Sequence, residues 1–203
     1  MQEENIVTGI TALAKGRYKI EVDGQPAFVL YRGELHSYGL KEGGRISEED
    51  LEEILSEILP RRAKLRSMNL LKSREYTEHQ IREKLRQGFY PEPVIDEALE
   101  YIKSFHYIDD RRYAKDYIVY HSESRSRGRI EQDLYKKGID RDLIRAVYEE
   151  DLEEELPDET ALMEKLLRKK NYDRDNADYQ ERQKMGAFLY RKGFSLDKIE
   201  KIL

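Results

Sequence analysis

The feature that most constrains the fold of this chain is a sequence pattern that occurs three times. Each copy is a stretch with apolar residues four positions apart, followed by a glycine and then by another apolar residue. Glycine adopts the left-handed conformation that ends a helix without steric cost, and the apolar residue after it folds back onto the last turn. The pattern therefore predicts three helices with the same kind of end, which stop at Gly88, Gly138 and Gly193.

Each of these helices is expected to lie between two others. Six residues after each glycine an apolar residue (Val94, Ile144 or Ile199) begins a further helical stripe, and an amphipathic stretch precedes each copy. The glycines are 50 and 55 residues apart. A three-helix unit of this length buries little apolar surface alone, so it needs contacts with its neighbours. We therefore expect a mainly α fold with three tandem three-helix, helix-turn-helix-like repeats in an elongated array.

The beginning of the chain follows a different period. Alternating apolar and polar residues predict β-strands at 6–13, 18–22 and 27–31. The Asp-Gly pair at 23–24 predicts a hairpin turn, and the Gln-Pro pair after it is expected to lengthen the loop beyond two residues. This small β-rich segment offers too little structure for an enzyme pocket.

From Ser47 onward the period becomes helical. Ser47 and Asp50 form a variant of the capping box, and the apolar stripe that follows predicts one helix that stops at Pro60. We interpret 1–59 as a separate β-rich N-terminal module, whose removal should leave 60–203 folded. The predicted domains are 1–59 for this module and 60–107, 108–155 and 156–203 for helical repeats one, two and three.

The residues that usually carry catalysis or bind metals are missing or scattered. The chain has no Cys, which excludes disulfides, thiolate zinc sites and cysteine nucleophiles, and its 4 His show no metal-ligand spacing. The carboxylate pair Asp109-Asp110 is tempting as a catalytic site, but it precedes an expected helix, where Asp is a preferred N-cap. We expect neither an enzyme nor a metal or cofactor.

The location of the protein is expected to be the cytoplasm. The apolar runs are only a few residues long, so we expect no membrane-spanning segment and no membrane partner. The N-terminus lacks the basic-then-apolar order of a secretion signal.

Charge is segregated along the chain. The net charge is -5, yet 61–90 holds 9 basic against 3 acidic residues, whereas 149–155 is almost entirely acidic. Binding follows local patches rather than the sum, so the net charge does not exclude nucleic acid as a partner. The alternative interpretation of each cluster is a solvated helix face.

We predict a contact surface where basic residues crowd the first two repeats and their junction. Arginine suits such a surface because its planar fork grips carboxylate or phosphate with two parallel hydrogen bonds. The predicted contact residues are Arg74, Arg112, Arg125, Arg127, Arg129, Lys136 and Lys137. A secondary basic patch comprises Arg61, Arg62, Lys64, Arg66, Lys169, Lys170, Arg191 and Lys192.

Five short stretches of the repeats together form a distinctive pattern. They are Tyr-Ile-Asp-Asp-Arg-Arg-Tyr-Ala at 107–114, Arg-Gly-Arg-Ile at 127–130, Leu-Tyr-Lys-Lys-Gly-Ile at 134–139, Gly-Phe at 88–89 and Arg-Lys-Gly-Phe at 191–194. With these stretches the chain resembles the RecX family of bacterial regulatory proteins. The resemblance covers about 60–203, and the β-rich segment is similar to the N-terminal extension of longer members.

The resemblance implies a regulator of homologous recombination, DNA repair and the SOS response. Such a protein would bind the RecA recombinase filament, lodge in its groove, and modulate, above all inhibit, its ATPase, strand-exchange and coprotease activities. We expect a monomer, and contact with single- or double-stranded DNA stays open. Two alternatives also stay open: a helical DNA-binding transcriptional regulator, and a protein-protein scaffold that touches no nucleic acid.

Overall fold

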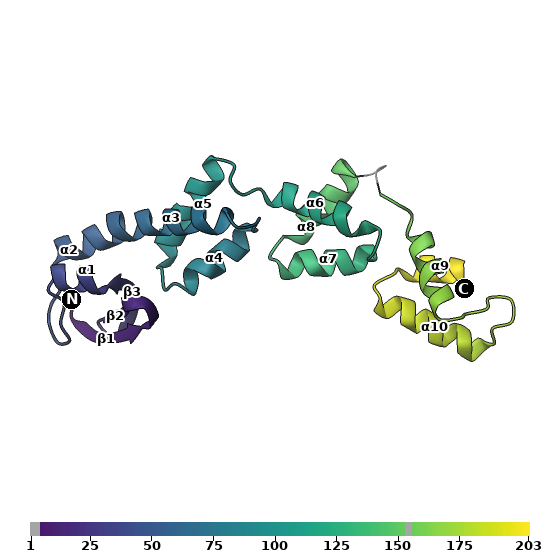
Figure 1. Ribbon diagram of the computed structural model, residues 1–203, viewed down its shortest axis with the longest axis horizontal. Helices are drawn as coiled ribbons and strands as arrows, with labels where there is room; N and C mark the ends of the chain where they lie inside the picture. Colours follow the sequence, from purple (N-terminus) through teal and green to yellow (C-terminus); the bar gives the residue numbers. More distant parts are fainter. Residues whose placement is uncertain (1–4, 153–155) are drawn as a thin grey trace. The chain divides into compact units, whose positions relative to one another are not determined.

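The computed structural model describes residues 5–152 and 156–203. It divides the chain into two compact units, which meet in the sequence between Ile108 and Asp109. A small sheet and the first three-helix repeat belong to the first unit, and the second and third repeats belong to the second (Figure 1). Among the described residues, the first unit has one shared core, whereas each repeat of the second has its own.

The sheet has three antiparallel strands in the order β1, β2, β3. All three predicted strands are confirmed, and a 3-10 turn (Ala14–Gly16) joins the first two. The strands are β1 (Val7–Leu13), β2 (Arg17–Val22) and β3 (Gln25–Tyr31).

The turn between β2 and β3 is tighter than predicted. Asp23 and Gly24 form the hairpin turn, as expected, and both have positive φ angles. Val22 pairs directly with Gln25, however, so the loop has two residues and the predicted lengthening is wrong. Pro26 lies within β3, where the register shifts, because a residue without an N–H is tolerated at an irregularity of an edge strand.

A continuous helix follows the sheet and the short helix α1 (Arg32–Ser37). It runs through α2 (Glu48–Glu53), a π-helical turn (Ile54–Ile58) and α3 (Leu59–Leu71). Ser47 caps it as predicted, since its Oγ accepts a hydrogen bond of 3.0 Å from the backbone N–H of Asp50.

The predicted stop of this helix at Pro60 is wrong. Pro60 lies in the first turn of α3, and the turn before it is π-helical, with the N–H of Leu59 bonded to the carbonyl of Ile54. A π turn shifts the bonding partner by one residue, and its wider backbone accommodates the missing N–H and the ring of the proline. The helix therefore continues where an ordinary α-helix would break.

The sheet and the first repeat share one core. Phe28 of β3, Ile54 of the π turn and Ile95 of the first repeat belong to a single buried cluster. Arg62 of α3 also donates a hydrogen bond of 2.9 Å to the backbone carbonyl of Val29 in β3. The boundary after residue 59 stays a prediction, but this packing means that a cut there exposes core side chains on both sides.

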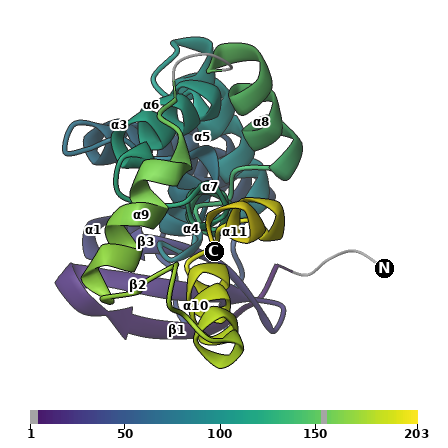
Figure 2. The same cartoon turned by 90° about the vertical axis from the view of Figure 1, so that its right-hand side faces the viewer.

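The three-helix repeats are confirmed. Within the second unit, the helices of the second repeat and those of the third form separate groups (Figure 1), and the helices of the third repeat gather around the C-terminus (Figure 2). Besides α3, the repeats contain α4 (Glu78–Arg86) and α5 (Glu92–Ser104); α6 (Asp110–Ser122), α7 (Arg127–Lys136) and α8 (Arg141–Ala146) with a π-helical turn (Val147–Asp151); and α9 (Glu159–Lys169), α10 (Tyr179–Arg191) and α11 (Leu196–Ile202).

The N-cap predicted at Asp109 is confirmed, and a capping box begins another helix of the repeats. Thr77 and Gln80 form a capping box at the start of α4. Asp109 caps α6, because its Oδ1 accepts a 3.0 Å hydrogen bond from the backbone N–H of Arg112. The pair at 109–110 therefore begins a helix.

In the second and third repeats the middle helix ends as predicted. Gly138 and Gly193 have φ angles of 85° and 91°. The apolar residue after each glycine donates its N–H to a leucine carbonyl five positions back. This is the helix end in which a left-handed residue lets the chain fold back onto the last turn.

The first repeat ends its middle helix differently. The corresponding hydrogen bond runs from Tyr90 to Leu85, and the left-handed residue is Phe89, with a φ of 61°. The prediction that Gly88 adopts this conformation is therefore wrong by one residue. Gly88 is needed for space instead, because a Cβ there would lie 2.9 Å from the ring of Tyr90.

We expect Ile54→Ala to destabilise the first repeat, although Ile54 precedes it in the chain. Ile54 is fully buried in the shared core, and the cavity left by truncation should lower the free energy of unfolding by about 2–5 kcal/mol. Hydrogen exchange on the full chain should then accelerate in α4 and α5. Leu65→Ala, on α3 but half exposed, is the control and should change little. Unaltered exchange in α5 would show that 1–59 has a core of its own.

Candidate functional site

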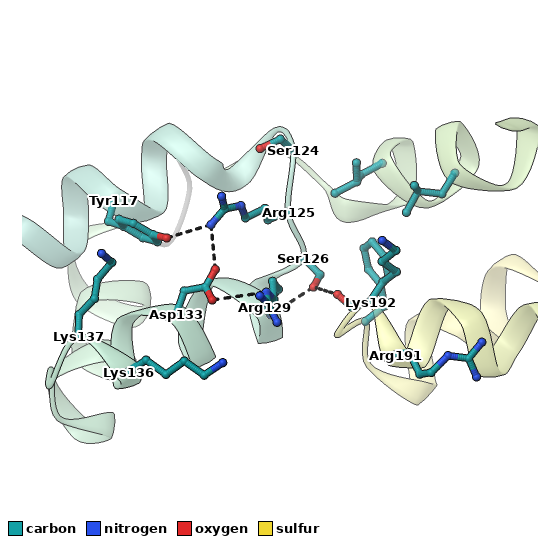
Figure 3. Close-up of a pocket in the computed structure, with 13 residues that line it drawn as sticks. Tyr117, Ser124, Arg125, Ser126, Arg129, Asp133, Lys136, Lys137, Arg191 and Lys192 are labelled. Atoms are coloured by element: carbon teal, nitrogen blue, oxygen red, sulfur yellow. Dashed lines mark hydrogen bonds and ion pairs between the residues drawn. The ribbon is translucent and has the colours of Figure 1, made fainter.

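The second unit contains a basic groove between its two repeats (Figure 3). The groove has a volume of about 790 Å³, and its walls come from α6, α7, α9, α10 and the turns that follow α6 and α10. Six cations and one carboxylate line it, together with apolar and hydroxyl side chains. The lining residues are Arg125, Arg129, Lys136, Lys137, Arg191, Lys192, Asp133, Tyr117, Ser124, Ser126, Leu162, Leu166 and Phe194.

Asp133 holds two of the arginines in place. Arg125 donates hydrogen bonds of 2.8 Å to Asp133 Oδ2 and 2.9 Å to the hydroxyl of Tyr117. Arg129 Nε lies 3.4 Å from the other oxygen of Asp133, as Figure 3 shows. The side chain of Asp133 is only 14% exposed, so these pairs are partly shielded from solvent. Because one carboxylate faces six cations, the groove keeps a surplus of positive charge.

The other cations of the groove are held more loosely. Lys137 lies over the ring of Tyr117 at 5.2 Å, and Lys192 lies 5.8 Å from the ring of Phe188. Lys136 and Arg191 are exposed, and within the part of the chain that the structure describes no ion pair holds either of them. These two side chains are therefore available to an acidic partner.

Tyr117 of α6 lines the groove and belongs to a row of aromatic rings along that helix. The rings of Tyr113 and Tyr117 are nearly parallel at 6.3 Å, and His121 follows 4.3 Å from Tyr117. Burial lowers the pKa of His121, and the neighbouring guanidinium of Arg125 lowers it further. Both effects favour the neutral form of the imidazole.

A close contact fixes the second repeat against the third beside the groove. Ser126, the N-cap of α7, donates a 2.6 Å hydrogen bond to the backbone carbonyl of Lys192 and accepts one of 3.3 Å from the N–H of Arg129. A Cβ on Gly128 would lie 2.5 Å from the carbonyl oxygen of Gly193. The two backbones therefore approach too closely for any residue but glycine at 128.

Glu159 provides a second contact between the second and third repeats. One of its oxygens accepts a 2.6 Å hydrogen bond from the backbone N–H of Arg127, and the other accepts one of 2.6 Å from Lys198. The side chain of Glu159 is 12% exposed. Both oxygens of one shielded carboxylate thus tie the start of α7 to α9 and α11.

Comparison with known proteins places the repeats in a family. Models of the first, second and third three-helix domains of RecX match 63–101, 109–147 and 158–203. A relative named Regulatory protein RecX from Caldanaerobacter subterraneus is 30% identical over 188 residues, with 92% of each chain covered. This chain belongs to the RecX family. Another relative of that name, from Clostridioides difficile, is 30% identical, with 92% of this chain and 88% of the relative covered.

Two crystal structures of RecX proteins share the fold. One, described as regulatory protein RecX, superposes with a TM-score of 0.61 at 28% identity and covers 97% of this chain and 98% of its own. The other, RecX from Lactobacillus salivarius, has a TM-score of 0.58 at 25% identity and covers 71% of this chain and 94% of its own. The RecX resemblance predicted from the sequence is therefore confirmed.

The structure brings some of the predicted contact residues together and separates others. Arg112 is exposed on α6 outside the groove lining, Arg127 stacks on the ring of Tyr148 at 4.1 Å, and Arg74 lies over Tyr76 at 4.3 Å in the first unit. That any of them contacts a partner stays a prediction. Those that line the groove are Arg125, Arg129, Lys136 and Lys137, joined by Arg191 and Lys192 from the secondary patch.

The rest of the secondary patch is divided between structural and exposed positions. Arg62 pairs with Glu34, and Lys64 with Glu97 at 2.7 Å, so both stabilise the first unit. The remaining members are Arg61, which is exposed, Arg66, which is half-buried, and Lys169 and Lys170, which are exposed on and just after α9.

The groove residues that are not cations were not predicted. Tyr117, Leu162 and Leu166 lie on the amphipathic first helices of their repeats, where they pack against the cores and also line the groove. A sequence signal existed for Asp133, which lies four residues after Arg129, the spacing of a helical ion pair. No local signal indicated that α9 would face α7.

The acidic run at 149–155 is partly tied to the fold. Arg111 donates hydrogen bonds of 2.7 Å to Glu150 and 2.8 Å to Asp151, and its bond to Asp151 lowers the pKa of that carboxyl. Residues 153–155 lie outside the described part of the chain. Among the residues described, no helix is long and apolar enough to cross a membrane, and no cluster of acidic or His side chains is placed to hold a metal ion.

We expect Gly128→Ala to destabilise the second unit, although alanine favours a helix over glycine by about 1 kcal/mol. The added methyl group would overlap the carbonyl of Gly193, and such overpacking lowers the free energy of unfolding by about 1–3 kcal/mol. Urea unfolding followed by circular dichroism measures the change.

Gly186→Ala in α10 is the matched control for this substitution. Its Cβ would lie 3.5 Å from the nearest side-chain atom, an ordinary contact. This variant should be neutral or more stable by about 0.4–1 kcal/mol. If Gly128→Ala behaved in the same way, the close contact between the repeats would be refuted.

Proposed function

We propose that this chain binds the RecA recombinase filament and inhibits its ATPase, strand-exchange and coprotease activities by lodging in the filament groove. Membership of the RecX family of regulatory proteins supports a regulatory role. The observation that carries the proposal is the basic groove, in which six cations face a single carboxylate. Such a surface binds an acidic partner.

The lining of the groove favours a partner with protein character as well as negative charge. Leu162, Leu166 and Phe194 add apolar surface beside the cations, and Asp133 adds an acceptor. A phosphate backbone alone would leave the apolar part unused, whereas a protein surface with acidic and apolar side chains would cover both. A recombinase filament on DNA presents protein and phosphate together.

Inhibition of this kind requires no catalysis. A protein with several modest contact sites along its repeats binds a repeating filament through their combined avidity. Once bound, it excludes a second DNA molecule or a protein substrate from the same groove. The exposed cations Lys136 and Arg191 are the side chains we expect to form the main charge contacts.

The double substitution Lys136→Glu and Arg191→Glu tests the proposal. Neither side chain has a partner within the described structure, so the variant should fold normally. We expect inhibition of RecA ATP hydrolysis and strand exchange on single-stranded DNA to weaken on the order of tenfold or more. The slope of log affinity against log salt should fall by about one for each cation that contacts phosphate.

The matched control is Lys184→Glu with Lys201→Glu, which changes the same charge on exposed residues of the third repeat outside the groove. It should inhibit like the parent protein. Equal inhibition by both variants would place the contact elsewhere. Tight binding to isolated DNA without recombinase would instead favour a DNA-binding regulator.

A further inference from the structure

A small recess in the first unit is lined by three arginines. It lies between the sheet, α3 and the end of α4, and Arg17, Arg62 and Arg66 line it. Its volume is about 20 Å³, which admits one or two atoms of the size of oxygen. No carboxylate lines it among the residues that the structure describes.

The three guanidinium groups differ in how well they are paired. Arg62 is neutralised by Glu34 and bonds to the Val29 carbonyl at 2.9 Å. Arg66 has only a long bond of 3.5 Å from one terminal nitrogen to the carbonyl of Lys84, and its Nε is buried without an acceptor. A buried donor without a partner is unfavourable. An acceptor from outside the described part of the chain would therefore stabilise this nitrogen.

The third arginine is also incompletely paired. Arg17 donates a single bond, from Nε to the backbone carbonyl of Ala14 at 3.3 Å. Its terminal nitrogens have no partner among the described residues. After Arg62 is neutralised, the recess therefore keeps the charge of Arg17 and Arg66.

The backbone beside the recess is arranged in an unusual way. Phe89, which also lines it, has a left-handed φ of 61°, a conformation that is strained for a residue with a side chain, and it leaves 44% of Phe89 exposed. This conformation places Tyr90 against the recess, over Gly88. Burial raises the pKa of Tyr90, so its hydroxyl stays protonated and retains a hydrogen to donate.

We propose that this recess receives one oxygen of a phosphate group whose other atoms stay outside it, and that the phosphate oxygens accept hydrogen bonds from Arg66 and Arg17. Two unneutralised guanidinium groups match the charge of a phosphate near pH 7 better than that of a carboxylate. The phosphate comes either from a free phosphate or from a nucleic-acid backbone, and the chemistry is the same. The site is separate from the basic groove and goes beyond the proposed inhibition of the recombinase.

Calorimetric titration of the full chain with inorganic phosphate at constant ionic strength tests the site. We expect one saturable site in the parent protein. Arg66→Gln and Arg17→Gln should each weaken binding by about tenfold to a hundredfold, because each removes a charge-assisted hydrogen bond. Arg61→Gln is the matched control, since Arg61 is exposed on the same helix as Arg66 and does not line the recess. Circular dichroism verifies the fold, and Arg17→Gln keeps the test valid if Arg66→Gln unfolds.

A second titration with a short oligothymidylate lacking terminal phosphates identifies the source. Weaker oligonucleotide binding by the same two variants would assign the site to backbone phosphates. A loss confined to inorganic phosphate would assign it to free phosphate. The proposal is overturned if neither probe binds in a way that depends on Arg66 and Arg17, whatever happens to inhibition of the recombinase.

Discussion

One hydrogen bond at the end of the middle helix organises each three-helix repeat. The bond runs to the carbonyl of Leu85, Leu134 or Leu189 from the residue five positions later, at 3.2–3.3 Å. All three leucines are fully buried, so the bond forms against the core of each repeat. It reverses the chain and brings the third helix back onto the first two. Without this reversal, the apolar stripes of a repeat would not face one another.

The same helix ends also build the two candidate sites. In the third repeat, the turn at Gly193 lies against Gly128 and Ser126, and this contact positions α9 and α10 beside α7. In the first repeat, the shift of the left-handed position to Phe89 brings Tyr90 against the arginine recess. Both sites therefore depend on how a helix ends rather than on long dedicated loops.

The distribution of charge in space differs from its distribution along the chain. In the most basic stretch, 61–90, many cations form ion pairs within the fold. Arg82 and Arg86 both donate to Glu92, and Arg62 pairs with Glu34. The basic groove instead collects its cations from 125–192, a stretch that also holds the acidic run at 149–155. A cluster of cations in the sequence is thus a poor guide to a binding surface, because intramolecular carboxylates neutralise many of them.

The sequence by itself determined the repeats, the strands and the helix caps. These features depend on local physics: the period of the apolar residues, the backbone freedom of Gly138 and Gly193, and the hydrogen bonds of Thr77 and Asp109 to the residues just after them. Four of the predicted contact residues also proved to share one groove, although their function stays a prediction.

Only the tertiary structure decided which of these features meet. The groove between the second and third repeats is lined by residues distant in the chain, and the π turn before Pro60 packs Ile54 into a core that the sheet and the first repeat share. Ser126 and Lys192 are 66 positions apart, yet one hydrogen bond joins them and sets the groove. Local sequence specifies where a helix ends and which of its faces is apolar. Which apolar faces pack together depends on the apolar surface buried in the whole fold, and no single segment determines that sum.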